Sequence, residues 1–206
     1  MPFAGPYFFL FLLHTRVFQA PHSLCQHKDS TSQKHEHGDV FEAEGLKVFG
    51  PRKNAAILEG SKAFSKDLMK KYHIPTAAYE NFDDPEKALA YLQTAKYPIV
   101  LKADGLALGK GVLICNTKEE AEAGVKEIMQ DKKFGSAGNR MVIEEFMTGR
   151  EVSVLSFVDG KTIRTMTSAQ DHKRAQDGDQ GLNTGGMGTF SPSPFYTCLL
   201  YTSRCV

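Results

Sequence analysis

PIVLKADGLALGKG, residues 98–111, is the stretch of sequence that decides the fold. Its first part, Pro98–Ala103, is a continuous apolar run with Lys102 near its end, which is typical of a buried strand. A glycine-rich loop follows this run, and after the loop comes a second apolar run, Val112–Cys115. A P-loop would need Ser or Thr directly after its lysine and then a helix facing the phosphate, but here Gly111 and an apolar run follow. The sequence therefore predicts a strand, a glycine-rich loop and a second strand.

This loop has the composition of a phosphate-binding lid. Gly105, Gly109 and Gly111 allow backbone N–H groups to approach phosphate oxygens closely, and a flexible loop can close over them. Lys102 at the strand end places a positive charge where α- and β-phosphates would lie, and Lys110 adds another. A solvated loop that happens to contain lysines explains the same residues, so the pattern alone leaves both interpretations open.

Two later segments also carry polar groups in useful patterns. The segment VIEEFM, residues 142–147, predicts a strand whose backbone could bond an adenine edge, and Glu151 beyond it could bond ribose hydroxyls. An edge strand with exposed acids is the alternative. In the third segment, charged and amide side chains interleave with glycines, in QDHKR (170–174), DGD (177–179) and NTGGMG (183–188). Such a segment is expected to be a binding loop or a mobile loop, and suits a substrate with a phosphate and an amine.

The composition bounds the class of protein. The chain has 206 residues, 41% hydrophobic and 24% charged, as expected of a soluble globular protein with one domain or two small ones. Its net charge of +1 gives no electrostatic footprint for nucleic acid or an anionic membrane, so neither partner is expected. Four cysteines without framework spacing indicate a reduced, cytoplasmic protein.

The first residues carry no clear folding pattern. Tyr7–Leu13 is an apolar run in a leader-like position, but no basic residue precedes it and it is too short to span a bilayer. Secretion is the alternative that this run leaves open. Residues 1–39 hold five of the seven histidines, but their spacing with Cys25 matches no zinc finger. An unstructured or non-native segment is therefore expected for 1–39, and residues 40–61 are expected to be the end of a preceding domain and a linker.

Several further elements are predicted from periodicity and caps. Residues 45–51 predict a short buried strand, and Ser61 predicts the start of a helix with Phe64, Leu68, Met69 and Tyr72 on its apolar side. A helix from Asp83 or Asp84 buries Ala88, Leu89 and Leu92, and a capping box at Thr117 and Glu120 opens a helix showing Ala121, Val125, Ile128 and Met129. Residues 140–146 predict a strand, and 151–158 with 161–166 predict a hairpin around Asp159-Gly160.

Taken in order, these segments resemble the glycinamide ribonucleotide synthetase family of ATP-grasp ligases. The matching stretches are FGPRKNAAILEGSKAFSKD (49–67), PIVLKADGLALGKGV (98–112), VIEEFMTGREVS (142–153), AQDHKR (169–174) and DGDQGLNTGGMG (177–188). The resemblance covers residues 40 to 196, with Leu182 where the family usually has proline. It implies an α+β fold: an incomplete ATP-grasp domain over 62–196, with a small lid subdomain at about 75–148 and part of the main domain.

The resemblance also implies an enzyme and its reaction. Such ligases use ATP with Mg²⁺ or Mn²⁺ to convert glycine into glycyl phosphate, which the amine of 5-phosphoribosylamine then attacks to give glycinamide ribonucleotide in purine synthesis. A carboxylate becomes a good electrophile only when one oxygen turns into a phosphate leaving group. The protein mostly positions the reactants and stabilises charge on the transferred phosphoryl group.

Site residues follow from the same resemblance, position by position. The expected nucleotide-binding residues are Lys62, Lys102, Gly105, Gly109, Lys110, Gly111, Glu144, Glu145, Phe146, Met147 and Glu151. The expected substrate-binding residues are Asp171, His172, Lys173, Arg174, Asn183, Thr184, Gly185, Gly186, Met187 and Gly188. Asp171, Lys173 and Arg174 are the expected catalytic groups, and no metal ligand is expected within this chain.

The resemblance has three departures. Residues 1–39 lack the glycine-rich opening of the family, the family's Mg²⁺ ligands lie on strands beyond Tyr196, and residues 197–206 resemble a non-native tail. We therefore expect a piece of the enzyme that does not turn over by itself. Two alternatives remain: another ATP-grasp ligase, such as a carboxylase subunit acting on bicarbonate, and a non-catalytic nucleotide-binding module.

Overall fold

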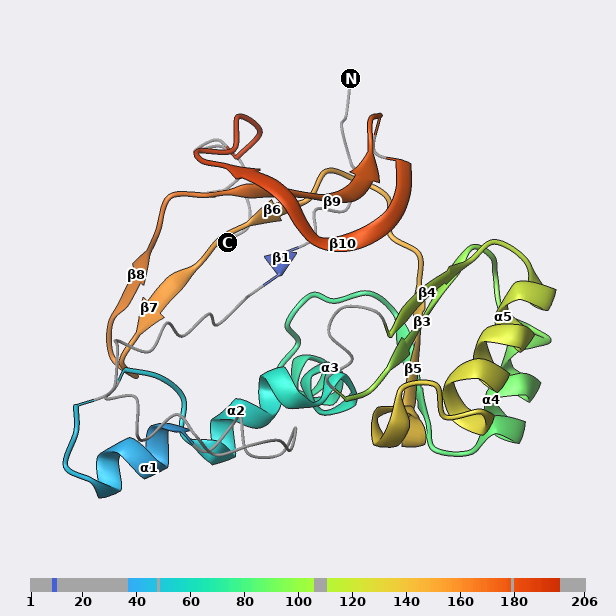
Figure 1. Ribbon diagram of the computed structural model, residues 1–206, viewed down its shortest axis with the longest axis horizontal. Coiled ribbons are helices and arrows are strands. Elements are labelled where there is room, and N and C mark those ends of the chain that lie inside the picture. The colour runs from blue at the N-terminus through green and yellow to red at the C-terminus, as the bar shows by residue number, and fades with distance from the viewer. Residues whose placement is uncertain (1–8, 11–36, 48, 106–110, 179, 197–206) are drawn as a thin grey trace. The chain divides into compact units, whose positions relative to one another are not determined.

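A computed structural model describes residues 9–10, 37–47, 49–105, 111–178 and 180–196 (Figure 1). The chain forms two compact units. The first runs from Thr15 to Phe146, and the second combines Met1–His14 with Met147–Val206. The limits expected at residues 39, 61 and 196 stay predictions.

The first unit is built on a four-stranded antiparallel sheet. Its order is β2 (Tyr79–Phe82), β5 (Met141–Glu145), β3 (Ile99–Ala103) and β4 (Val112–Cys115). Lys102 on β3 lies opposite Val112 on β4, and the Ala103 N–H donates to the Gly111 carbonyl at 2.8 Å. The prediction of a strand, a loop and a second strand is confirmed on the described residues.

One face of this sheet carries the hydrophobic core. α4 (Pro85–Leu92) and α5 (Lys118–Val125), which continues as the π-helical turn η2 (Lys126–Gln130), cover that face (Figure 1). The sheet contributes Ile99, Leu101, Ala103, Met141 and Ile143, and the helices contribute Ala88, Leu92, Ala121, Val125, Ile128 and Met129. Both helix starts are confirmed, because the Asp84 carboxylate accepts from the Glu86 N–H and the Thr117 hydroxyl accepts from the Glu120 N–H. The Glu120 carboxylate accepts from the Asn116 N–H in place of the Thr117 N–H of the expected capping box.

The other face of the sheet meets α3 (Lys62–Lys71). Strand alternation places Lys102 and Glu144 on this face, since Leu101 and Ile143 point into the core. Ser61 caps α3 as predicted, accepting from the Phe64 N–H. The apolar side expected of α3 is buried only in part, since Leu68 and Met69 are half-buried. Ala63 and Lys66 are buried, whereas Phe64 is 39% and Tyr72 60% exposed, because α3 turns an ionic side to the sheet.

The segment before α3 is helical. α1 (His37–Ala43) and α2 (Lys53–Gly60) flank residues 44–52, and the strand predicted at 45–51 is wrong for the described residues there. Leu46 and Phe49 are 42% and 56% exposed, so this short apolar run is not buried by the described residues. Residues 1–39 were expected to be unstructured, but the short strand β1 (Phe9–Leu10) lies within this segment and α1 begins in it. Of the histidines and the cysteine considered for zinc, His22, Cys25, His27 and His35 lie outside the described residues, as does the side chain of His37.

The second unit consists of hairpins. β6 (Val152–Ser153) pairs with β1 in parallel, and β7 (Ser156–Val158) pairs with β8 (Ile163–Thr165) around the predicted turn, where Asp159 accepts from the Lys161 and Thr162 N–H groups. The segment expected to be a loop is instead an antiparallel hairpin of β9 (Gln170–Gln176) and β10 (Gln180–Phe190). Register shifts occur between Gln180 and Asn183 and between Asn183 and Gly188. Among the described residues, no helix has the length and apolar character needed to cross a membrane.

Candidate functional site

A buried ionic cluster lies on the α3 face of the first unit. Glu144, whose side chain is 3% exposed, accepts through one oxygen, Oε2, from Lys102 Nζ at 3.0 Å and from Lys66 Nζ at 3.1 Å. Lys102 and Glu144 reach each other across β3 and β5 because Val142 lies opposite Lys102 and Val100 lies opposite Glu144, which makes them diagonal neighbours. The second oxygen, Glu144 Oε1, is buried and has no hydrogen-bond partner in the described part of the chain. The cluster therefore combines two cations with one anion and keeps a buried acceptor open.

Lys62 holds the base of the glycine-rich loop. Its Nζ donates to the carbonyls of Ala103 and Gly105, both at 2.9 Å. Asp104, at the same base, accepts from the Ala63 N–H at 2.7 Å and from the Ser61 hydroxyl at 3.0 Å. The carboxylate thus lies at the N-terminus of α3, where the free N–H groups and the helix dipole favour negative charge. These contacts fix where the loop leaves the sheet.

Burial changes the acidity of two of these lysines. Loss of water contact lowers the pKa of Lys62 below 10.5, although the charge of Asp104 opposes the effect. Burial lowers the pKa of Lys66 in the same way, and the charge and hydrogen bond of Glu144 oppose it. A dry site makes each charge act more strongly on an anionic ligand.

The described part of the glycine-rich loop is closely packed. A Cβ atom on Gly105 would lie 2.9 Å from the Ala137 Cβ, so only glycine fits there without a shift. Ala137 belongs to the short 3-10 helix η3 (Gly135–Asn139). Gly111 is buried beside β3, whereas Gly109 and Lys110 lie outside the described residues.

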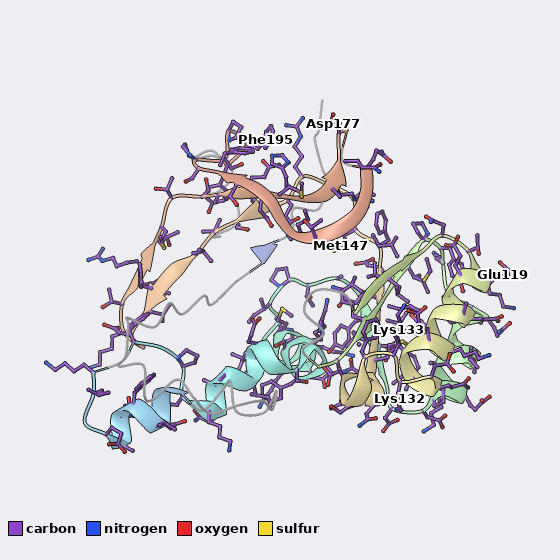
Figure 2. All side chains as sticks on the ribbon, in the orientation of Figure 1. Glu119, Lys132, Lys133, Met147, Asp177 and Phe195 are labelled. Atoms are coloured by element: carbon purple, nitrogen blue, oxygen red, sulfur yellow. The ribbon has the colours of Figure 1, made fainter. Side chains whose placement is uncertain are left out.

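The end of β5 is where the expected adenine-side segment begins. The backbone of Glu145 is already used, because its N–H donates to the Ala78 carbonyl at 2.9 Å, and its side chain accepts from the Ala78 N–H at 2.9 Å. Phe146 follows the strand and is 36% exposed. Met147, labelled in Figure 2, begins the second unit. The Glu145 N–H is therefore not available to a ligand.

A second ionic group lies in the second unit. Lys173 on β9 donates to Glu151 and contacts Asp171 at 3.2 Å. Asp171 and Lys173 are two residues apart on one strand and so share a face. Burial opposes the charge of Lys173, but the hydrogen bonds and charges of Glu151 and Asp171 outweigh it and raise its pKa.

The other expected substrate-binding residues surround this group on the hairpin. The His172 and Phe190 ring centroids lie 5.5 Å apart, and Arg174 Nη1 donates to the Gly181 carbonyl at 3.1 Å. Thr184 Oγ1 donates to the Lys173 carbonyl at 2.8 Å and accepts from the Gly186 N–H at 3.1 Å. The remaining expected residues lie on β10: Asn183, Gly185, Met187 and Gly188. Figure 2 labels Asp177, which lies in the turn between β9 and β10.

Two residues of the first unit's cluster were not predicted. Lys66 lies four residues after Lys62, so both occupy one side of α3, and that spacing was the available signal. Asp104 follows directly after β3, at the point where the chain turns towards α3. As for metals, the described residues contain no group of three or more His, Cys, Asp or Glu side chains that could hold an ion.

Comparison with known proteins identifies the family. The family model for the phosphoribosylglycinamide synthetase ATP-grasp (A) domain matches residues 60–203. The chain belongs to the phosphoribosylglycinamide synthetase ATP-grasp family. A phosphoribosylamine–glycine ligase of Pasteurella multocida is 58% identical over 159 residues, and that of Escherichia coli K12 is 55% identical. In both comparisons the match covers 77% of this chain and 37% of the relative, so the chain spans well under half the length of these family members.

Solved structures agree with the family assignment. The crystal structure of phosphoribosylamine–glycine ligase from Thermotoga maritima aligns with a TM-score of 0.67 at 45% identity, covering 74% of this chain and 39% of that one. The biotin carboxylase domain of the Hydrogenobacter thermophilus 2-oxoglutarate carboxylase aligns with a TM-score of 0.56 at 21% identity, covering 70% and 32%. At that lower identity the likeness concerns the fold, which is the α+β ATP-grasp fold expected from the sequence.

Proposed function

We propose that this chain binds ATP through its first unit and takes part in the ligation of glycine to 5-phosphoribosylamine. The observation that carries the proposal is the ionic cluster of Lys66, Lys102 and Glu144 beside the base of a glycine-rich hairpin, in a chain of this family. The cluster offers the open donors of Lys102 to phosphate oxygens, and the acceptor Glu144 Oε1, unpaired within the described residues, suits an amino group of the ligand. Nucleotide phosphates and a base amine have this combination of groups.

The proposed chemistry has two steps. An oxygen of the glycine carboxylate attacks the γ-phosphorus of ATP, forming glycyl phosphate and releasing ADP. The amine of 5-phosphoribosylamine then attacks the acyl carbon, forming the amide bond, while inorganic phosphate leaves and the nitrogen loses a proton. In both steps a phosphate oxygen leaves with negative charge, ADP in the first and inorganic phosphate in the second. Fixed positive groups such as Lys102 and Lys62 would lower the barrier by electrostatic stabilisation and positioning.

We assign the second unit's hairpin to the phosphoribosyl and glycine substrates. Lys173 and Arg174 supply positive charge for a phosphate or carboxylate, and Asp171 supplies an acceptor for an amine. Glu151, which Lys173 contacts directly, is proposed as a ribose-binding carboxylate. The glycines of β10, Gly185, Gly186 and Gly188, allow a ligand to approach the backbone.

Mg²⁺ would accompany ATP and neutralise its phosphate charge during transfer. The described residues contain no group of three or more His, Cys, Asp or Glu side chains that could hold it, and no step is routed through it. We also propose a cytoplasmic protein without nucleic-acid partners, as its composition suggests.

Nucleotide titration of the 206-residue chain tests the proposal. Replacing Lys102 with Met should weaken ADP binding about tenfold or more, because a charge-assisted contact to phosphate is lost while the side-chain length is kept. Lys118→Met is the matched control, since this lysine is 41% exposed and its partners, Gln93 and Glu122, lie outside the ionic cluster. Equal ADP affinity in the wild type and Lys102→Met would count against the proposal.

A further inference from the structure

The two lysines that share Glu144 differ in their surroundings. The Lys66 side chain is 7% exposed and that of Lys102 is 23% exposed. Lys66 Nζ donates to Glu144 Oε2, to Thr76 Oγ1 at 2.8 Å and to the Ala77 carbonyl at 3.4 Å. Because a lysine ammonium has three N–H donors, Lys66 is fully used. Within the described residues Lys102 Nζ bonds only Glu144, so it keeps donors open.

The charge balance of the cluster depends on this difference. A buried carboxylate that loses its partner is left as an uncompensated charge, which strongly disfavours the loss. If Lys102 were the only partner of Glu144, Lys102 could turn towards a ligand only by leaving Glu144 as an uncompensated buried charge. Lys66 bonds the same oxygen, so Glu144 would still have a counter-ion when Lys102 turns towards a ligand.

We propose that Lys66 is a positioning residue of the nucleotide site, the permanent counter-ion of Glu144 that leaves Lys102 free to bind the polyphosphate. The inference rests on the proposed function. It assigns Lys66 an effect on the ligand without contact, since its three donors already have protein partners.

A set of variants of the 206-residue chain tests this, with ADP and inorganic tripolyphosphate as probes. Tripolyphosphate has no base, so its affinity reports the phosphate contacts alone. Lys66→Met should weaken both probes about tenfold, because Glu144 then holds Lys102. Adding Glu144→Gln should restore most of the tripolyphosphate affinity, since the neutral amide no longer competes for Lys102. Lys71→Met, an exposed change on the same helix, should leave both affinities unchanged.

A purely structural role for Lys66 predicts the opposite pattern. In that case the double variant would bind tripolyphosphate no better than Lys66→Met, which would overturn the proposal, as would unchanged affinity in Lys66→Met. If Lys66→Met fails to fold, Glu144→Gln and the double variant decide. Neither of these two variants has the buried carboxylate charge, so they differ only at Lys66. Equal affinity of the two for tripolyphosphate supports the inference. Weaker binding by the double variant shows that Lys66 contacts the ligand directly, which refutes the inference. Absence of binding of either probe to the wild type would overturn the proposed function, and this inference with it.

Discussion

Cys115, at the end of β4, makes the stability of the first unit depend on pH. Its side chain is 2% exposed within the hydrophobic core, and burial raises the pKa of the thiol from 9.0 to about 11. Between pH 9.0 and about 11 the thiol is largely ionised in the unfolded chain but still protonated in the folded one. The stabilisation that the buried neutral thiol provides is therefore complete below pH 9.0 and is lost as pH rises towards 11. At about pH 10.5 the loss should reach about 2 kcal/mol. Urea unfolding followed by the helical circular dichroism signal measures it.

Cys115→Val is the control for this effect. The variant keeps an apolar side chain of similar size in the core, but it has no group that titrates there. Most tyrosines and lysines contribute equally in both proteins, and the exception is Tyr97, whose raised pKa depends in part on the Cys115 charge. The difference between the two unfolding free energies therefore reports chiefly the thiol. A difference that stays constant between about pH 8 and 10.5 would contradict the assigned shift.

Among the single residues of the ionic cluster, the sequence predicts Lys102 but not Lys66. Lys102 was predictable because a lysine ends an otherwise apolar strand, and alternation then places it opposite the core. Lys66 was not recognised because the apolar side chains around it, Phe64 and Leu68, favour a different buried face of α3. Burial of a lysine depends on its partner, and Glu144 lies far away in the sequence. Its pairing is a tertiary contact that no local pattern contains.

Between elements, the contact of η2 with η3 supports the glycine-rich loop. A Cβ atom on Gly138 would lie 2.1 Å from the Ile128 carbonyl oxygen, and a backbone atom cannot move aside cheaply. Gly138→Ala should therefore destabilise the first unit by about 3 kcal/mol. It should also weaken ADP binding, because the loop base packs on Ala137 and the Asp104 N–H donates to the Arg140 carbonyl at 3.0 Å.

The matched control for Gly138→Ala is Ser136→Ala in the same short helix. Ser136 is exposed, so its change should alter the unfolding free energy by less than about 0.5 kcal/mol. Urea unfolding and ADP titration of both variants check the prediction. A fully stable Gly138→Ala would show that η2 and η3 can separate without loss.

Elements with a strong period or cap were predictable, and the others were not. α4 and α5 follow from their caps and apolar spacing, and β3, β4 and β5 follow from apolar runs. The hairpin of β9 and β10 was predicted as a loop because its residues are polar and glycine-rich, and its register shifts break the alternation. The error at residues 45–51 is the reverse, because a strand was predicted there and none forms. This apolar run has no partner strand among the described residues.

At the scale of the whole molecule, the two compact units carry different groups of site residues. The first holds Lys62, Lys66, Lys102 and Glu144, and the second holds Glu151, Asp171, Lys173 and Arg174. If the units bind different ligands, each ligand should slow amide hydrogen exchange mainly in its own unit. ADP is expected to protect residues 99–103 and 111–115, and glycinamide ribonucleotide, the proposed product, residues 170–190.

Paired variants turn this expectation into a test of separate sites. At an ADP concentration near its Kd, Lys102→Met should strongly reduce the protection by ADP and leave that by glycinamide ribonucleotide. Lys173→Met should do the reverse, because each variant removes a charge from one unit only. Ribose 5-phosphate is the control ligand, since it keeps the phosphate but lacks the glycinamide group. If it protects the β9–β10 hairpin as well as glycinamide ribonucleotide does, the hairpin recognises the ribose phosphate and not the glycinamide group. If both ligands protect one unit and neither protects the other, the division of substrates between the units is wrong, even though ATP-grasp family membership would stand.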